Sequence, residues 1–79
     1  MGENKPSWRK MTAARVIDDP DGVEVIFLES AQFYRLPREN PAFDSLVAML
    51  HDAINKGAAV KVRTASIASD VIEDIGPAR

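Results

Sequence analysis

The segment from Asn40 to Gly57 constrains the fold most, because it combines a helical pattern with signals for where a helix starts and stops. Asn40 can accept a hydrogen bond from a free amide at a helix start, and Pro41 suits the first turn. Gly57 can adopt the left-handed conformation that ends a helix. The apolar positions on one helical face are Phe43, Leu46, Val47, Leu50 and Ile54. The pattern therefore predicts one amphipathic helix over 40–57.

Short segments with strand patterns lie on both sides of this helix. They span 8–17, 23–28 and 32–36 before it, and 58–64 and 71–75 after it. The sequence Asp-Asp-Pro-Asp-Gly at 18–22 is typical of a turn and makes the first two strands a hairpin. The order β-β-β-α-β-β predicts a mainly β protein with one helix, arranged as a five-stranded OB-like Greek-key barrel.

The 79 residues allow one small domain. We expect a mobile tail over 1–10, a single OB-like domain over 11–76 and a short tail over 77–79. The residues whose spacing predicts a shared core are Val23, Val25, Phe27, Leu36, Phe43, Leu46, Val47, Leu50, Ile54, Val60, Val62 and Ile75.

A set of positions resembles a known group of proteins. These positions are Phe33-Tyr34-Arg35-Leu36-Pro37, Asn40-Pro41, Leu46, Leu50, Ala53, Gly57, Val60 and Val62. Over residues 11 to 75 the chain resembles small bacterial OB-type proteins, which are similar to the binding subunits of pentameric AB-type toxins. The resemblance implies a barrel and an oligomer, and it transfers no ligand-binding residue to this chain.

The side chains that usually carry chemistry are few. The chain has no cysteine, and His51 is its one histidine, which leaves no paired ligands for zinc. The acidic residues at 18–24 lack the terminal Glu of an EF-hand loop, so we interpret them as a polar turn. No serine lies in a Gly-x-Ser-x-Gly pattern. We therefore predict no catalytic, cofactor-binding or metal site, no cofactor and no enzyme activity.

The strand at 23–28 breaks the alternation of a small barrel. If Val23, Val25 and Phe27 point inward, then Ile26 and Leu28 point outward beside Glu24, and the opposite register also leaves apolar side chains outside. Either a second copy or the segment containing Trp8 can cover such a surface. The predicted function is a non-enzymatic, self-associating interaction module. Its candidate oligomer interface is Ile26, Leu28 and Glu24.

The alternative is a barrel face that binds single-stranded nucleic acid or an oligosaccharide. The candidate ligand face is Tyr34, Arg35, Lys61 and Arg63. The net charge of −2 and the absence of a cation in 23–28 argue against nucleic acid. We expect a homo-oligomer, with an unknown protein as a further possible partner. No secretory signal and no membrane span is recognisable, so the expected location is cytoplasmic.

Overall fold

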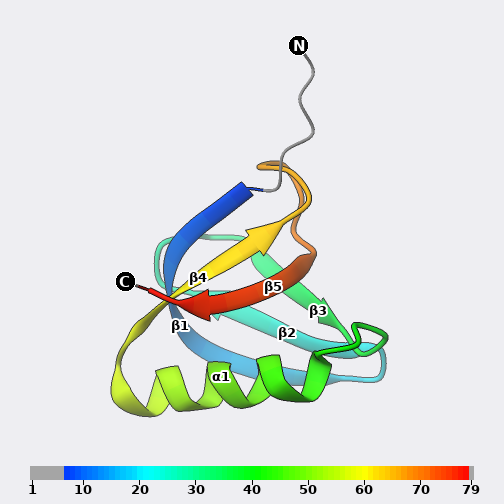
Figure 1. The fold of residues 1–79 in the computed structure, drawn as a ribbon, viewed down its shortest axis with the longest axis horizontal. Helices are drawn as coiled ribbons and strands as arrows, with labels where there is room; N and C mark the ends of the chain where they lie inside the picture. The colour runs from blue at the N-terminus through cyan, green and yellow to red at the C-terminus, as the bar shows by residue number, and fades with distance from the viewer. Residues whose placement is uncertain (1–6, 79) are drawn as a thin grey trace.

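The computed structural model describes residues 7–78, which form five strands and one helix (Figure 1). The elements are β1 (Ser7–Asp19), β2 (Gly22–Phe27), β3 (Phe33–Pro37), α1 (Phe43–Lys56), β4 (Ala59–Thr64) and β5 (Ile72–Pro77). The predicted element order is confirmed, and the predicted boundaries lie within a few residues of the observed ones.

The strands form one sheet in the order β3-β2-β1-β4-β5, and all neighbouring strands run antiparallel. The predicted closed OB-like Greek-key barrel is not confirmed, because the edge strands β3 and β5 share no ladder. A single parallel bridge joins Arg35 to Val71, where the Arg35 amide donates to the Asp70 carbonyl at 2.8 Å. The sheet is therefore curved toward closure and remains open along most of this seam.

Strand β1 builds both halves of the sheet. Its first part, Ser7 to Thr12, pairs with β4, and its second part, Ala13 to Asp19, pairs with β2. The register shifts between Ala13 and Arg15, a bulge that bends the strand. Met11 and Ala13 are buried before the bulge, whereas Val16 packs on the core after it. The regular alternation of inward and outward side chains in β1 therefore ends at Ala13.

Hydrogen bonds from the end of β2 hold β1 at this bend. The Thr12 carbonyl accepts from the Leu28 amide at 2.9 Å, and the Thr12 amide donates to Glu29 Oε1 at 2.7 Å. The bond from the Thr12 backbone amide is the main reason that the pKa of Glu29 lies below its ordinary value of 4.5. The Glu29 carboxylate thus accepts the hydrogen bond that a backbone carbonyl of a neighbouring strand would otherwise accept, at the point where β1 changes its pairing between β4 and β2.

This contact predicts an acid-sensitive stabilisation. A carboxyl group whose pKa is lower in the folded chain than in the unfolded chain stabilises the fold at pH values above its unfolded-state pKa. This stabilisation is lost as pH falls through the folded-state pKa. Glu29→Gln cannot titrate. We therefore expect the difference in urea midpoint between wild type and Glu29→Gln to shrink between pH 7 and pH 3. A difference that is constant over this range would contradict the role of Glu29.

The core lies between the concave face of the sheet and α1. Nine of the twelve predicted core residues are buried, and the other three, Phe43, Val47 and Ile54, pack against them while partly exposed. Core residues that the sequence pattern did not identify are Met11, Ala13, Tyr34, Ala53 and Ile72. Tyr34 is fully buried and meets the Phe27 ring edge-on, with centroids 5.4 Å apart. In β2, the inward register is that of Val23, Val25 and Phe27.

Helix α1 lies across one end of the curved sheet and contacts β1, β4 and β5 (Figure 1). It starts later than predicted: the N-cap position is Ala42, and the Asn40 side chain accepts from the Ala42 amide in a turn that precedes the helix. The Asn40 side-chain amide also donates to the Glu73 carbonyl and ties this turn to β5. The predicted end is confirmed, since Gly57 has φ of 66° and its amide reaches the Ala53 and Ile54 carbonyls.

Strands β1 and β5 extend to Ser7 and Pro77, near the two ends of the described region. Ser7 to Lys10 pair with β4, so regular structure begins before residue 11, where the domain was predicted to start. Gly76 and Pro77, which lie beyond the predicted end of the last strand at residue 75, pair with Lys61 and Val60. Of the other predicted tail residues, Ala78 follows β5 outside the strand, and 1–6 and 79 lie outside the described residues.

Candidate functional site

The predicted oligomer interface lies on the outward side of β2 and just beyond its end. Glu24 and Ile26 are half-buried on the convex face, and Leu28 is 71% exposed after the strand. Strand pairing places Phe33, which is 49% exposed, opposite Ile26. An apolar surface therefore exists where the sequence predicted one, and its use as a contact between copies stays a prediction.

The predicted ligand face is not a single face. Tyr34 points inward, because β3 alternates and Phe33 and Arg35 occupy the outward positions. The Tyr34 hydroxyl accepts from Arg9 Nη1 at 2.9 Å, and Arg9 also donates to the Ile67 carbonyl. Placing Tyr34 on a ligand face was therefore wrong: its ring belongs to the core.

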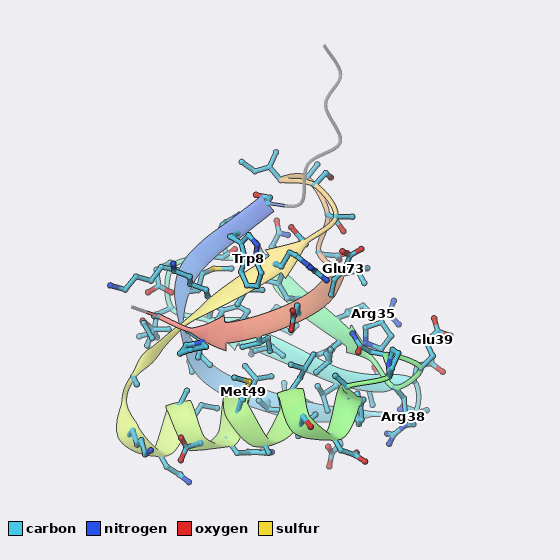
Figure 2. The ribbon with its side chains drawn as sticks, viewed as in Figure 1. Trp8, Arg35, Arg38, Glu39, Met49 and Glu73 are labelled. Carbon is cyan, nitrogen blue, oxygen red and sulfur yellow. The ribbon has the colours of Figure 1, made fainter. Side chains whose placement is uncertain are left out.

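The remaining candidates lie on different parts of the convex surface. Lys61 and Arg63 belong to β4, whereas Arg35 lies on β3 at the far edge of the sheet. The Arg63 guanidinium lies over the Trp8 ring, 5.7 Å from its centroid, and its Nε is 3.8 Å from a Glu73 carboxylate oxygen. Figure 2 shows Trp8 well apart from Arg35 and Glu39. Arg63 is therefore held by its neighbours on β1 and β5.

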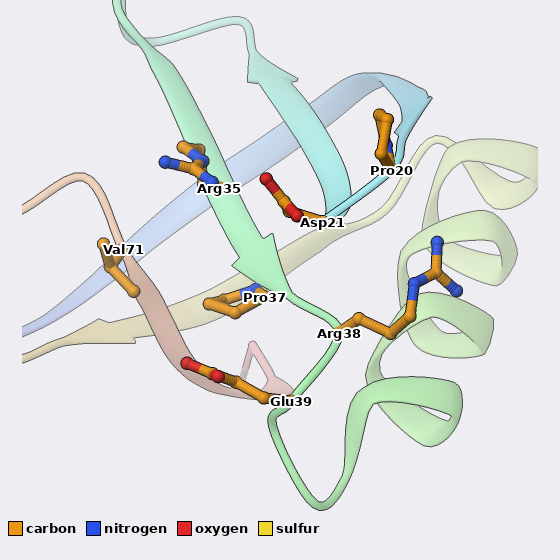
Figure 3. Close-up of a pocket in the computed structure, with 7 residues that line it drawn as sticks. All are labelled: Pro20, Asp21, Arg35, Pro37, Arg38, Glu39 and Val71. Atoms are coloured by element: carbon orange, nitrogen blue, oxygen red, sulfur yellow. The ribbon is translucent and has the colours of Figure 1, made fainter.

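A shallow hollow of about 690 Å³ opens beside Arg35, at the seam between β3 and β5 (Figure 3). The residues that line it are Pro20, Asp21, Arg35, Pro37, Arg38, Glu39 and Val71. Prolines and Val71 supply apolar walls, while Arg35, Asp21 and Glu39 supply opposite charges. Within residues 7–78, Arg35 forms no ion pair within 4 Å.

Arg38 contributes to the hollow mainly through its backbone and the base of its side chain. Its guanidinium extends toward α1, where it lies 5.1 Å from the Phe43 ring centroid and donates to the Asp19 carbonyl at 3.3 Å (Figure 3). Arg35 is therefore the cation at this hollow that can bind a partner. Sequence reasoning missed the hollow, because its walls come from the 18–22 turn, from β3 and the loop after it, and from Val71 just before β5, which only the tertiary fold brings together.

The described residues contain no recognisable catalytic constellation. His51 is exposed on α1, and Ser30 and Ser69 accept hydrogen bonds from the backbone amides of Gln32 and Val71 in turns. Between residues 7 and 78, no group of three or more His, Cys, Asp or Glu side chains could hold a metal ion. In the same range, no helix is long and apolar enough to cross a membrane.

Comparison with known proteins gives a structural likeness and no sequence match: no family model and no curated protein matches the chain. The fold is similar to that in a crystal structure of pro-protein-glutaminase, with a TM-score of 0.77 and 20% identity over 89% of this chain. A mutant of that protein matches with a TM-score of 0.76 and 18% identity. In both cases this chain spans 24% of the neighbour's length.

This finding corrects three predictions. The structural neighbours are precursors of an enzyme, so the resemblance to toxin binding subunits was wrong. The residues behind it were core aliphatics and turn formers, which many small β folds share. The prediction of a non-enzymatic interaction module, with its nucleic-acid or oligosaccharide alternative, is contradicted by the same neighbours, whereas the predicted contact between copies is not tested by them. The same neighbours also contradict the prediction that the chain has no enzyme activity. At 18–20% identity, the likeness establishes a shared fold.

Proposed function

We propose that this chain is a covering domain of a protein-glutaminase-type proenzyme: it binds the catalytic part of such an enzyme and blocks access of protein substrates. The supporting observation is the likeness to about a quarter of pro-protein-glutaminase. A precursor combines catalytic groups with a segment whose removal or movement releases activity. In this proposal, the chain is the segment whose removal or movement releases activity.

The residues described above favour the covering part over the catalytic part. Hydrolysis of a side-chain amide needs a nucleophile with an adjacent base, or an activated water. The chain has no cysteine, and in residues 7–78 no serine bonds to the exposed His51. Catalytic groups would then come from another segment or chain, and this domain would control them.

A test compares ammonia release by mature protein-glutaminase from a glutamine-containing protein, with and without this chain. We expect inhibition that increases with the concentration of the chain and disappears after the chain is digested. The heat-unfolded chain is the control. An unchanged rate at tens of micromolar would refute the covering role. Ammonia release by this chain alone would also refute it and would assign the catalysis to the chain itself.

We also propose that the sheet belongs to the OB-like barrels, with an open seam between β3 and β5. The bridge between Arg35 and Val71 supports this arrangement, since it lies where a closed barrel would have a parallel ladder. The position of α1 between the third and fourth strands supports it as well.

A further inference from the structure

The outward side chains of the β1-β2-β3 half form one continuous surface, which we name the β2–β3 outer face. Its members are Arg15, Ile17, Glu24, Ile26, Phe33 and Arg35. The registers place Arg15, Ile26 and Phe33 in one row across the three strands, and Ile17, Glu24 and Arg35 in the next. Side chains in such rows lie close enough to contact each other.

Three members of this face, Ile17, Ile26 and Phe33, form an apolar patch that the helix does not cover, and Glu24 lies between Ile17 and Arg35 in the second row. Phe33 is 49% exposed, and Ile17 and Ile26 are half-buried. Leu28, just beyond the end of β2, is 71% exposed. Helix α1 contacts β1, β4 and β5 at the end of the sheet and leaves the outer side of β2 and β3 open (Figure 1). An exposed aromatic side chain beside aliphatic ones is typical of a protein-binding surface.

Two arginines lie at opposite corners of this face, beside the apolar patch. Arg15 and Arg35 are exposed, and neither forms an ion pair within 4 Å in residues 7–78. Glu24 lies opposite Arg35 in the β2–β3 register, yet it also does not pair at that distance. Arg35 additionally borders the hollow beside Val71. The free guanidinium groups can each bind a carboxylate through two parallel hydrogen bonds.

We infer that the β2–β3 outer face docks onto a surface of the proenzyme's catalytic domain. This partner surface has an apolar centre flanked by carboxylates. This inference rests on the proposed function and names the surface that performs it. Phe33 fills the apolar centre, while Arg15 and Arg35 bind the flanking carboxylates. The charge pattern determines the partner's chemistry, because buried guanidinium groups require acidic partners.

The experiment uses the full chain and mature protein-glutaminase as the probe. Binding is measured by calorimetry for wild type, Phe33→Ala and Arg35→Gln, with Lys61→Gln as the matched control. Lys61 is an exposed cation on the convex side of β4, outside this face. We expect Kd to rise at least about tenfold for Phe33→Ala, as for an aromatic anchor at an interface. Arg35→Gln should raise Kd several-fold, and Lys61→Gln should change it by less than about twofold.

Hydrogen exchange on the same mixtures separates the possible failures. Slowed exchange of β2 and β3 in the complex, together with these Kd changes, supports the inference. Slowed exchange confined to the surface around Trp8, Arg63 and Glu73, with inhibition retained, would overturn the docking face and keep the covering role. Absence of both complex and inhibition would overturn the two together. Unchanged circular dichroism melts establish that the variants are folded.

Discussion

Gly22→Ala should unfold or severely destabilise the protein. Gly22 starts β2 with φ of +151°, a conformation that residues with a side chain rarely adopt. A Cβ atom at this position would lie 2.2 Å from the Leu36 carbonyl oxygen and 2.9 Å from the Arg38 amide nitrogen. Both atoms belong to the backbone of the neighbouring segment and cannot rotate away. We expect a loss of about 3–5 kcal/mol, at the upper end for single substitutions.

The measurement is a urea denaturation curve followed by circular dichroism. Gly76→Ala is the matched control, because Gly76 also lies in a strand but has an ordinary backbone. A Cβ atom there would meet the Trp8 ring at 3.9 Å, a normal contact distance. Gly76→Ala should therefore leave the midpoint nearly unchanged. Equal midpoints for the two alanine variants would contradict the close approach of Gly22 to β3.

Leu50→Ala should cost about 2–5 kcal/mol, the usual range for removing a buried leucine side chain. Leu50 is completely buried at the centre of α1, between Leu46 and Ala53, and lies against the sheet. In a chain of 79 residues, one core leucine is a large part of the packing that opposes the entropy of unfolding. The variant should therefore be partly unfolded near physiological temperature.

Thermal and urea melts of Leu50→Ala and His51→Ala provide the comparison. His51 follows Leu50 on the same helix but is exposed, so its replacement should change stability by no more than about 0.5 kcal/mol. If Leu50→Ala melted like wild type, α1 would not pack on the sheet as described. If both variants were equally destabilised, the loss would reflect helix formation rather than burial.

The described structure shows which parts of the sequence pattern carried information about the fold. The helix over 40–57 and the strand at 23–28 were predicted well, because local periodicity is set by which side chains face the core. The bulge in β1 was not predicted, since it depends on pairing with β2 on one side and β4 on the other. The N-cap role predicted for Asn40 was not found. Its side chain accepts from the Ala42 amide in the turn before the helix and donates to the Glu73 carbonyl of β5.

The sequence by itself determined the element order, the inward face of the helix and most core residues, because these follow from the spacing of apolar side chains. Tertiary structure decided which side chains are exposed and where the surface is hollow. Tyr34 became core and Phe33 surface through the position of β3 beside β2. The hollow near Arg35 exists because the 18–22 turn, β3 with the loop after it, and Val71 just before β5 meet there. Contacts between segments far apart in sequence depend on strand order and curvature, which local spacing does not encode.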